Sequence, residues 1–320
     1  MHRTRPIVCL RNPPGTVPHL NDFLDGWYRS IVARGVPEVR LPDWPGRPSV
    51  TSLITRFRVQ RPLPFARTRA LTPMAWASDR DVFPAAFAYR LVPWIYDCWP
   101  ASWDRWEALL RRLKVEIACF SARGAADEFS RRLPNIGCHW IPEAVDPSVY
   151  DPSMPLAGRQ IDVLELGRRA EAVHRRIAPD LGRLGRRHVF RADGAPPLFK
   201  SRRALAEALG RTRVMLCHPK SITHPDEAGG LETVTYRYFE AMAAGCVVMG
   251  DCPAELRDLW GFDPVLPIDR DRPIESIMGV LANLPAHQAL VDRNLRRLAE
   301  VGTWDHRAAT MVALASRGTD

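Results

Sequence analysis

Two glutamates separated by seven residues, Glu232 and Glu240, have the spacing that most suggests ligand chemistry. On one helix, a step of eight residues would place them about 12 Å apart along the axis. This span is comparable with the distance from the sugar of a sugar nucleotide, across the diphosphate, to the ribose. Carboxylates accept hydrogen bonds from hydroxyls, so one glutamate would hold the sugar and the other the ribose. Two ordinary surface glutamates are the alternative interpretation.

The residues around this pair suit an anionic group. A predicted helix from Thr233 onward would present free amides and the positive end of its dipole to a diphosphate. Gly229 and Gly230, just before it, let the backbone approach a ligand without an intervening side chain. Arg237 either neutralises the diphosphate or pairs with Glu240, three positions along.

The polar segment 218–231 precedes this helix and contains His224, Asp226 and Glu227. These three side chains would contact the donor sugar if the segment folds over it. The alternative, and the more common situation in a loop, is that they are solvent-exposed and bind nothing.

The glutamate pair lies in a half of the chain where short apolar strands alternate with helices. The expected strands cover 161–166, 188–191, 214–217, 246–249 and 265–268. The expected helices cover 170–184 with a break at Pro179, 201–209, 233–244 and 254–260. This alternation is typical of a parallel, doubly wound sheet, which binds ligands at the carboxyl ends of its strands.

The first half of the chain shows the same rhythm less clearly. Its expected strands cover 7–10, 89–96 and 115–120, and its expected helices 20–33, 103–113 and 123–133. The proline-rich segment 141–155 is interpreted as the connection between two Rossmann-like domains. His19, near the first helix start, and Asp97, after a strand, are candidates for the acceptor side. Each has an alternative role as a cap or an internal hydrogen-bonding group.

Three tryptophans at helical spacing, Trp99, Trp103 and Trp106, have two interpretations. The favoured one is that they lie in the core. The other joins them with neighbouring arginines into a face that binds a membrane surface without spanning it. No segment reaches the ~18 uncharged apolar residues that a membrane-spanning helix requires.

The composition, 46% hydrophobic and 25% charged, is that of an ordinary globular protein, and the length predicts about two domains. The net charge of +9 would suit nucleic acid, but we find no recognition helix, RNA-binding aromatic pair or zinc finger. We therefore expect no nucleic-acid partner, and the phosphates of a sugar nucleotide or an anionic membrane surface are better partners for this charge. Seven cysteines without a CxxC pair, and no recognisable signal peptide, favour the cytoplasm, with peripheral contact to the inner membrane face as an addition.

Several motifs together carry a family resemblance. Segment 229–256, which contains both glutamates, resembles the Glu-x7-Glu motif of retaining GT-B glycosyltransferases such as those of family 4. It is still more similar to the CgeB-like branch, whose pattern resembles residues 236–246. Gly167-Arg168 resembles the Gly-Arg that brings a basic side chain to the diphosphate. Segment 139–147 resembles the entry to the interdomain linker, and 294–304 resembles the closing helices. The resemblance covers residues 115–318.

The resemblance implies an α/β, GT-B architecture: two Rossmann-like domains with parallel sheets that face each other across a cleft. The acceptor domain would cover 1–150, the donor domain 151–302, and a last helix, 303–320, would return to the first domain. The expected reaction transfers a sugar from a UDP-, GDP- or TDP-sugar to a hydroxyl of a saccharide, lipid-linked or small-molecule acceptor. Retention is favoured, and no cofactor or metal is expected. The alternatives are a catalytically silent binding or assembly protein, an epimerase and a phosphorylase.

The sequence departs from the family pattern around both phosphate and sugar. Glu232 is followed by Thr-Val-Thr instead of Gly-Phe-Gly, so the donor-sugar end is expected to differ. The family's lysine after Gly-Arg is missing, and Arg169, His174 and Arg175 are the candidates for the second phosphate-binding cation. Segment 12–15, Asn-Pro-Pro-Gly, stands where the family has a Gly-Gly loop.

Two Asp-Arg-Asp triplets, 79–81 and 269–271, look like the metal-binding motif of GT-A enzymes. Neither follows a recognisable nucleotide-binding strand, and the central arginine opposes a divalent cation. We therefore predict no metal site at either. In the expected mechanism, Arg168, Arg237 and the helix amides stabilise the departing diphosphate instead.

Overall fold

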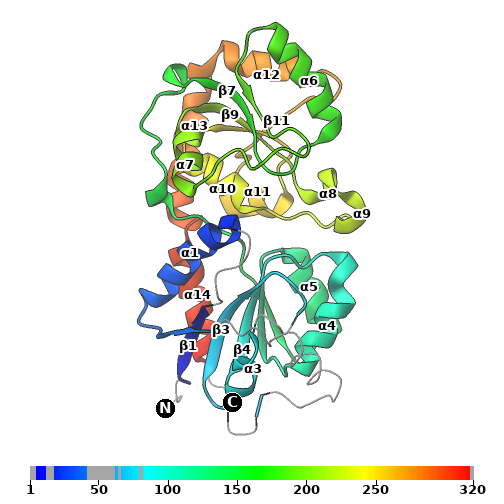
Figure 1. Ribbon diagram of the computed structural model, residues 1–320, viewed down its shortest axis with the longest axis vertical. Coiled ribbons are helices and arrows are strands. Elements are labelled where there is room, and N and C mark those ends of the chain that lie inside the picture. The colour runs from blue at the N-terminus through cyan, green and yellow to red at the C-terminus, as the bar shows by residue number, and fades with distance from the viewer. Residues whose placement is uncertain (1–4, 12–17, 42–61, 64–65, 79–81, 318–320) are drawn as a thin grey trace. The chain divides into compact units, whose positions relative to one another are not determined.

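The computed structural model describes residues 5–11, 18–41, 62–63, 66–78 and 82–317, without the side chains of 18–22. The chain forms two compact units, one of Met1–Glu143 with Trp304–Asp320 and one of Ala144–Thr303. We call them the N-terminal unit and the C-terminal unit (Figure 1). Among the described helices, none is long and apolar enough to cross a membrane.

The described strands of the N-terminal unit form a parallel sheet in the order β2-β1-β3-β4-β5-β6. They are β1 (Ile7–Arg11), β2 (Glu38–Arg40), β3 (Arg69–Met74), β4 (Arg90–Ile95), β5 (Ile117–Phe120) and β6 (Gly137–Trp140). Its α-helices are α1 (Pro18–Val32), α3 (Ala85–Ala88), α4 (Trp103–Arg112), α5 (Arg123–Arg132) and α14 (Trp304–Ser316). In Figure 1, α1 and α14 lie on one side of the sheet and α4 and α5 on the other.

Helix α14 is part of the N-terminal unit because its first residue enters an aromatic cluster. The ring of Trp304 lies 5.3 Å from that of Trp94 and 5.4 Å from that of Phe23. Gly26 makes room for it, since a Cβ there would lie only 2.4 Å from Cδ1 of Trp304. Helix α14 therefore packs on α1 at a position where only glycine fits.

The C-terminal unit has a second parallel sheet in the order β11-β10-β9-β7-β8. Its strands are β7 (Ile161–Glu165), β8 (His188–Val189), β9 (Thr212–Cys217), β10 (Val247–Gly250) and β11 (Leu266–Pro267). Its longer helices are α6 (Glu171–Arg183), α7 (Arg202–Gly210), α10 (Tyr236–Ala243), α11 (Ala254–Trp260), α12 (Pro273–Ala282) and α13 (Leu284–Val301). Two single-turn helices, α8 (Lys220–Thr223) and α9 (Pro225–Ala228), follow β9.

Side chains of the central strands alternate between two cores, one on each face of this sheet. Met215 packs with residues of α10 and α11, whereas its neighbours Val214 and Leu216 pack with residues of α6 and α12. Strand β10 alternates in the same way, with Val248 in the first core and Val247 in the second. Successive strand residues point to opposite faces, so a strand covered on both sides must be apolar throughout. This explains the continuous apolar runs that predicted a doubly wound sheet.

Three local predictions in the C-terminal unit are corrected. Helix α10 begins at Tyr236 and not at Thr233, because the backbone of Thr235 is extended and the amide of Val234 is bonded to the Glu255 carboxylate. Pro179 does not break α6 and lies inside it. Segment 218–231 is not a simple loop but contains α8 and α9. The glutamate pair is therefore not carried on one continuous helix.

Candidate functional site

Three chain segments of the C-terminal unit meet at the start of α10. The first is the turn after β7, where Gly167 has a φ of 84°. A Cβ on Gly167 would lie 3.8 Å from Nε of Arg237, so this turn lies directly beside the arginine of α10. The backbone at the left-handed φ favours glycine and leaves the approach to Arg237 free of a side chain.

The second segment consists of α8 and α9. Nζ of Lys220 forms an ion pair of 2.6 Å with Glu227. The hydrogen bond from Lys220 lowers the pKa of the Glu227 carboxyl, and the charges of Lys220, His224 and Arg168 lower it further. Arg168, next to Gly167, is therefore close enough to interact electrostatically with this helix pair. The result is a cluster of cations around one exposed carboxylate.

The third segment is the first turn of α10. The Thr235 side chain makes no capping hydrogen bond to this helix. The first amides of a helix form an anion-binding end when no cap occupies them. Gly229 and Gly230, with φ of 52° and 82°, turn the chain just before it. Glu232 and Thr233 follow outside any helix or strand, with Glu232 exposed and Thr233 buried.

The Glu240 carboxylate is buried and held on both oxygens. Oε1 accepts a hydrogen bond of 2.8 Å from the Tyr150 hydroxyl, and Oε2 accepts one of 2.6 Å from Arg237. Burial, and then the adjacent Glu240 charge, raise the pKa of Tyr150 far above its ordinary value, so its hydroxyl stays a donor. Desolvation lowers the pKa of Arg237, but its pairing with Glu240 outweighs this and raises it. Arg237 also stacks on Tyr236, with 4.4 Å from guanidinium to ring centre.

Comparison with protein families adds an independent observation. Residues 181–313 match a family described as "Glycosyl transferase-like". The chain carries a glycosyltransferase domain. The matched segment includes α10 with Arg237 and Glu240, whereas Gly167 and Arg168 precede it. A comparison of the sequence with curated proteins finds no match.

Solved structures with the same fold span nearly the whole chain. Sucrose-phosphate synthase from Thermosynechococcus elongatus is 15% identical, with a TM-score of 0.58 over 97% of this chain and 98% of that one. Trehalose 6-phosphate synthase from Burkholderia multivorans is 12% identical, with a TM-score of 0.54 over 92% and 79%. Anabaena HepE in complex with UDP is 11% identical, with a TM-score of 0.55 over 97% and 99%. The predicted GT-B fold with two Rossmann-like domains is confirmed.

The acceptor-side candidates of the glycosyltransferase lie in its N-terminal unit. Asp97 follows β4, at the carboxyl edge of the sheet, and accepts a hydrogen bond of 3.0 Å from Nε1 of Trp99. His19 lies in the first turn of α1, and its side chain is outside the described residues. Segment 12–15 and the triplet 79–81 lie outside them as well.

Arg169, His174 and Arg175 were the candidates for the second phosphate-binding cation, and the structure excludes His174. This side chain is buried and bonded to Glu165, so it does not reach the site. Arg169 is engaged with Asp193 at 2.8 Å and with the backbone of Arg191 at 2.7 Å. Arg175 is exposed on α6. Lys220, which the sequence analysis did not consider, lies beside Glu227 in the cation cluster instead.

His224, predicted at the sugar, is exposed at the junction of α8 and α9, and its Nδ1 lies 3.0 Å from the hydroxyl of Thr223.

A histidine–aspartate pair that was not predicted lies at the ends of two central strands. Nδ1 of His218, after β9, lies 2.6 Å from Oδ2 of Asp251, after β10. Arg270 binds the other oxygen of Asp251 at 2.6 Å, which assigns part of the triplet 269–271 to an ion pair. Burial raises the pKa of Asp251, but the bonds from His218 and Arg270 outweigh it and lower the pKa.

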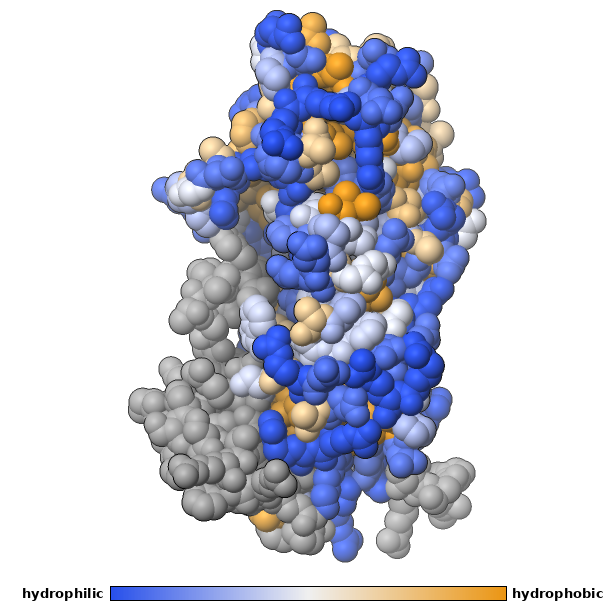
Figure 2. All heavy atoms as spheres, turned by 90° about the vertical axis from the view of Figure 1, so that its right-hand side faces the viewer, coloured by the Kyte–Doolittle hydropathy of each residue, from blue (hydrophilic) through white to orange (hydrophobic). Residues whose placement is uncertain are grey.

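Trp99, Trp103 and Trp106 do not form an exposed face. Trp106 is 1% exposed and Trp99 9% exposed, as the core interpretation predicted. Trp103 is half-buried under Arg132, whose guanidinium lies 5.5 Å from the ring centre. Figure 2 shows the side of the molecule that carries α4 and α5, and hydrophilic side chains cover most of its described surface there.

Proposed function

We propose that the chain transfers a glycosyl group from a nucleoside diphosphate sugar, bound by the C-terminal unit, to an acceptor hydroxyl. The observation that carries this proposal is the convergence on Arg237. Gly167 lies beside its guanidinium, Glu240 binds it, and the uncapped start of α10 lies one residue away. A carboxylate, a fixed cation and the amino end of a helix within one helical turn match the alternation of hydroxyls and phosphates in such a donor.

The diphosphate is assigned to the cations and the helix start. Arg168 and Arg237 approach from the turn after β7 and from α10, and Lys220 adds a third positive charge from α8. Fixed donors aimed at developing negative charge lower the barrier to departure of the diphosphate. With these cations in place, the transfer step needs no divalent cation, which is the basis for proposing metal-independent chemistry.

The two glutamates are assigned to hydroxyls on either side of the phosphates. Each oxygen of Glu240 accepts one bond from the protein and retains capacity for another, so the ribose hydroxyls can add to the bonds from Tyr150 and Arg237. Exposed Glu232 is assigned to the hydroxyls of the donor sugar. The resemblance to the Glu-x7-Glu motif and to the CgeB-like branch supports both assignments. Because the Anabaena HepE structures hold UDP and UDP-glucose, uridine nucleotides are the first donors to test, before GDP- and TDP-sugars.

The reaction proposed is a retaining transfer without a protein nucleophile. The bond between the anomeric carbon and the β-phosphate oxygen breaks, and its electron pair stays on the diphosphate. The acceptor oxygen bonds to the anomeric carbon on the face that the diphosphate leaves. The acceptor proton moves to the departing phosphate oxygen. His19 and Asp97 of the N-terminal unit are the proposed contacts of the acceptor.

The deciding experiment has two stages. Calorimetric titration of the full chain with UDP, GDP and TDP identifies the nucleotide, and the matching sugar nucleotides are then incubated with and without candidate acceptor sugars. Release of the nucleoside diphosphate together with a glycosylated acceptor supports the proposal. Binding without turnover indicates a silent binding protein. A changed sugar without an acceptor indicates an epimerase, and dependence on inorganic phosphate a phosphorylase.

A further inference from the structure

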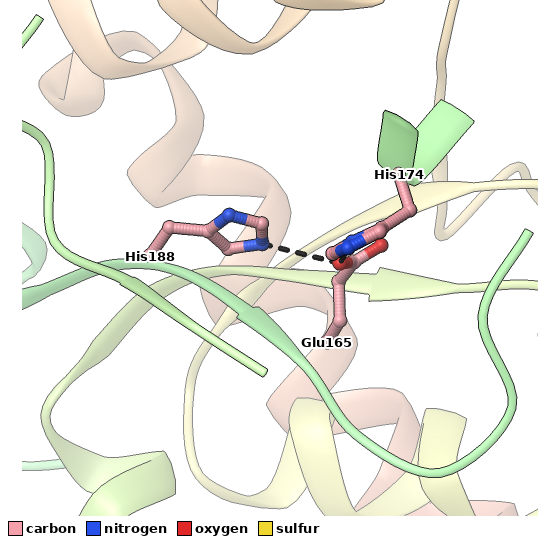
Figure 3. Close-up of side chains that lie close together, drawn as sticks. All are labelled: Glu165, His174 and His188. Atoms are coloured by element: carbon pink, nitrogen blue, oxygen red, sulfur yellow. Dashed lines mark hydrogen bonds and ion pairs between the residues drawn. The ribbon is translucent and has the colours of Figure 1, made fainter. Parts of the chain in front are cut away.

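We propose that Glu165, His174 and His188 form a binding site for one divalent transition-metal ion of the zinc type inside the C-terminal unit. Glu165 ends β7, His174 lies on α6, and His188 begins β8. Their side chains point toward one another from these three elements, with the carboxylate between the two imidazole rings (Figure 3). The proposal is independent of the reaction assigned above.

The spacing of the ligand atoms suits a small metal ion. One nitrogen of each imidazole and an oxygen of the carboxylate all lie within 4.8 Å of one another. Nε2 of His188 is 3.1 Å from Oε2 of Glu165, and Nδ1 of His174 contacts the same oxygen. Zinc bonds of about 2.0–2.2 Å in a tetrahedron separate neighbouring ligand atoms by roughly 3.3–3.6 Å. A small rotation of the side chains therefore places all three around one ion.

The charge and burial of Glu165 require a partner that the described residues do not supply. The Glu165 side chain is only 2% exposed, and its Oε1 is buried without a hydrogen-bond donor among the described residues. A bound cation would satisfy the unpaired oxygen, whereas two neutral imidazoles satisfy only the other. Nδ1 of His188 has no partner among the described residues, and an ion bound at Nε2 would not change this. This atom is therefore no argument for or against a bound ion.

The donor set and its surroundings indicate the kind of ion. Two imidazoles and one carboxylate are ligands for zinc and neighbouring first-row metals, not for magnesium or calcium, which prefer oxygen. The ring of Phe190 lies 4.6 Å from that of His174 and 4.8 Å from that of His188, which gives the site an apolar wall. Such a wall limits solvent access to a metal.

The site lies on the face of the sheet away from the start of α10. Val163, two residues before Glu165 on β7, packs with Val173 and Ile177 of α6, whereas Leu164 packs in the core that contains α10. Since Glu165 shares the face of Val163, the metal would tie β7, β8 and α6 together without contacting the diphosphate. The turn with Gly167 and Arg168 follows Glu165 directly, so the ion would act on the donor site only by stabilising this turn.

The test uses the untagged full chain, because a histidine tag binds zinc. After chelation and dialysis, the protein is titrated with Zn²⁺ by calorimetry, and a parallel sample with Co²⁺ is examined for the visible bands of a four-coordinate site. We expect one Zn²⁺ per chain, visible Co²⁺ bands, and a higher melting temperature with zinc. Glu165→Gln and the double variant His174→Gln/His188→Gln should bind Zn²⁺ at least ~100-fold more weakly.

The control is His306→Gln, which removes an exposed histidine of the N-terminal unit and should bind Zn²⁺ like the wild type. Wild-type protein that binds no Zn²⁺ and shows no cobalt bands overturns the proposal. Zinc affinity that is equal in Glu165→Gln and in the wild type overturns it as well. If the variants do not fold, the Zn²⁺ titration of the wild type alone decides the test. Failure of this test leaves UDP binding unaffected, so it is distinguishable from failure of the proposed function.

Discussion

Arg237 donates a hydrogen bond of 2.6 Å to Glu240, one helical turn further along α10, and so joins the proposed phosphate-binding and ribose-binding groups. The spacing of the two residues predicted either this pairing or a role of Arg237 at the diphosphate, and the pairing is confirmed. It does not remove the second role. The guanidinium has five donors, and one bond to Glu240 leaves others for phosphate oxygens.

The first prediction concerns Glu240→Gln. The amide keeps the shape and can still accept from Arg237, but it loses the charge that attracts ribose hydroxyls and arginine alike. We expect the affinity for UDP to fall about 10- to 100-fold, since hydrogen bonds to charged groups contribute ~1.5–3 kcal/mol. Calorimetric titration measures it, with circular dichroism to verify folding.

Tyr150→Phe is the matched control, because it removes only the hydroxyl that donates to Oε1. Losing one such bond should change affinity or stability by about 1 kcal/mol. If folded Glu240→Gln binds UDP as tightly as the wild type, the ribose assignment is wrong.

The second prediction separates sugar binding from nucleotide binding. Glu232 is exposed, so Glu232→Ala should not disturb folding. Loss of its contacts to the donor sugar should reduce transfer about 100-fold or more through misplacement of the anomeric carbon. The dissociation constant for UDP should stay the same. Rate measurements with a sugar nucleotide and an acceptor, beside a UDP titration, distinguish the two effects. Full transfer activity in Glu232→Ala refutes the role at the sugar.

The third prediction concerns Lys220→Ala. Its partner Glu227 is exposed, so the ion pair contributes little to stability, on the order of 0–1 kcal/mol. The affinity for UDP should nevertheless fall roughly tenfold, because one positive charge near the diphosphate is lost. Binding of uridine, which carries no phosphate, should not change. Arg203→Ala removes an exposed arginine of α7 and serves as the charge-matched control. Equal losses for UDP and uridine would place Lys220 away from the phosphates.

The repeating parts of the C-terminal unit were predictable because local pattern determines them. Strands such as β9 and β10 are covered on both faces, so successive residues on both sides must be apolar and form a continuous apolar run in the sequence. The end of α10 was also predictable, because Gly245 with its φ of 70° stops the helix.

Contacts between distant parts of the chain caused the errors. The start of α10 was misplaced because the Val234 amide bonds to Glu255, 21 positions further along. His174 was one of three candidates for the second phosphate-binding cation because spacing in the sequence does not reveal that this side chain of α6 contacts Glu165 of β7. Tyr150 and Lys220 were missed because neither belongs to a motif, and only the folded chain shows what they contact.

The fourth prediction concerns stability against pH in the N-terminal unit. The Glu116 carboxylate bonds to Arg69 at 2.9 Å and to Arg90 and Arg5. Burial raises its pKa, but these arginines outweigh burial and bring the pKa below the ordinary 4.5. A carboxyl with a lowered pKa stabilises the fold above its unfolded-state value, and this stabilisation is lost as the pH falls through the lower, folded-state value.

Glu116→Gln should therefore lower the free energy of unfolding by about 2 kcal/mol at pH 7, since it leaves buried Arg69 without its carboxylate. The difference from the wild type should shrink as the pH falls below 4.5. Urea unfolding at several pH values measures both. A difference that stays constant down to the lowest pH at which both proteins fold contradicts the lowered pKa.

The last prediction tests the docking of α14 on α1 with two helical glycines. At Gly26 a Cβ would lie 2.4 Å from Trp304, inside any van der Waals contact, whereas at Gly279 of α12 it would meet nothing within 4 Å. Gly26→Ala should therefore destabilise the protein by about 1–3 kcal/mol through overpacking. Gly279→Ala should stabilise it by roughly 0.5–1 kcal/mol, because alanine favours the helix. Thermal unfolding followed by circular dichroism gives both signs, and a stabilising Gly26→Ala would show that Trp304 does not pack against α1.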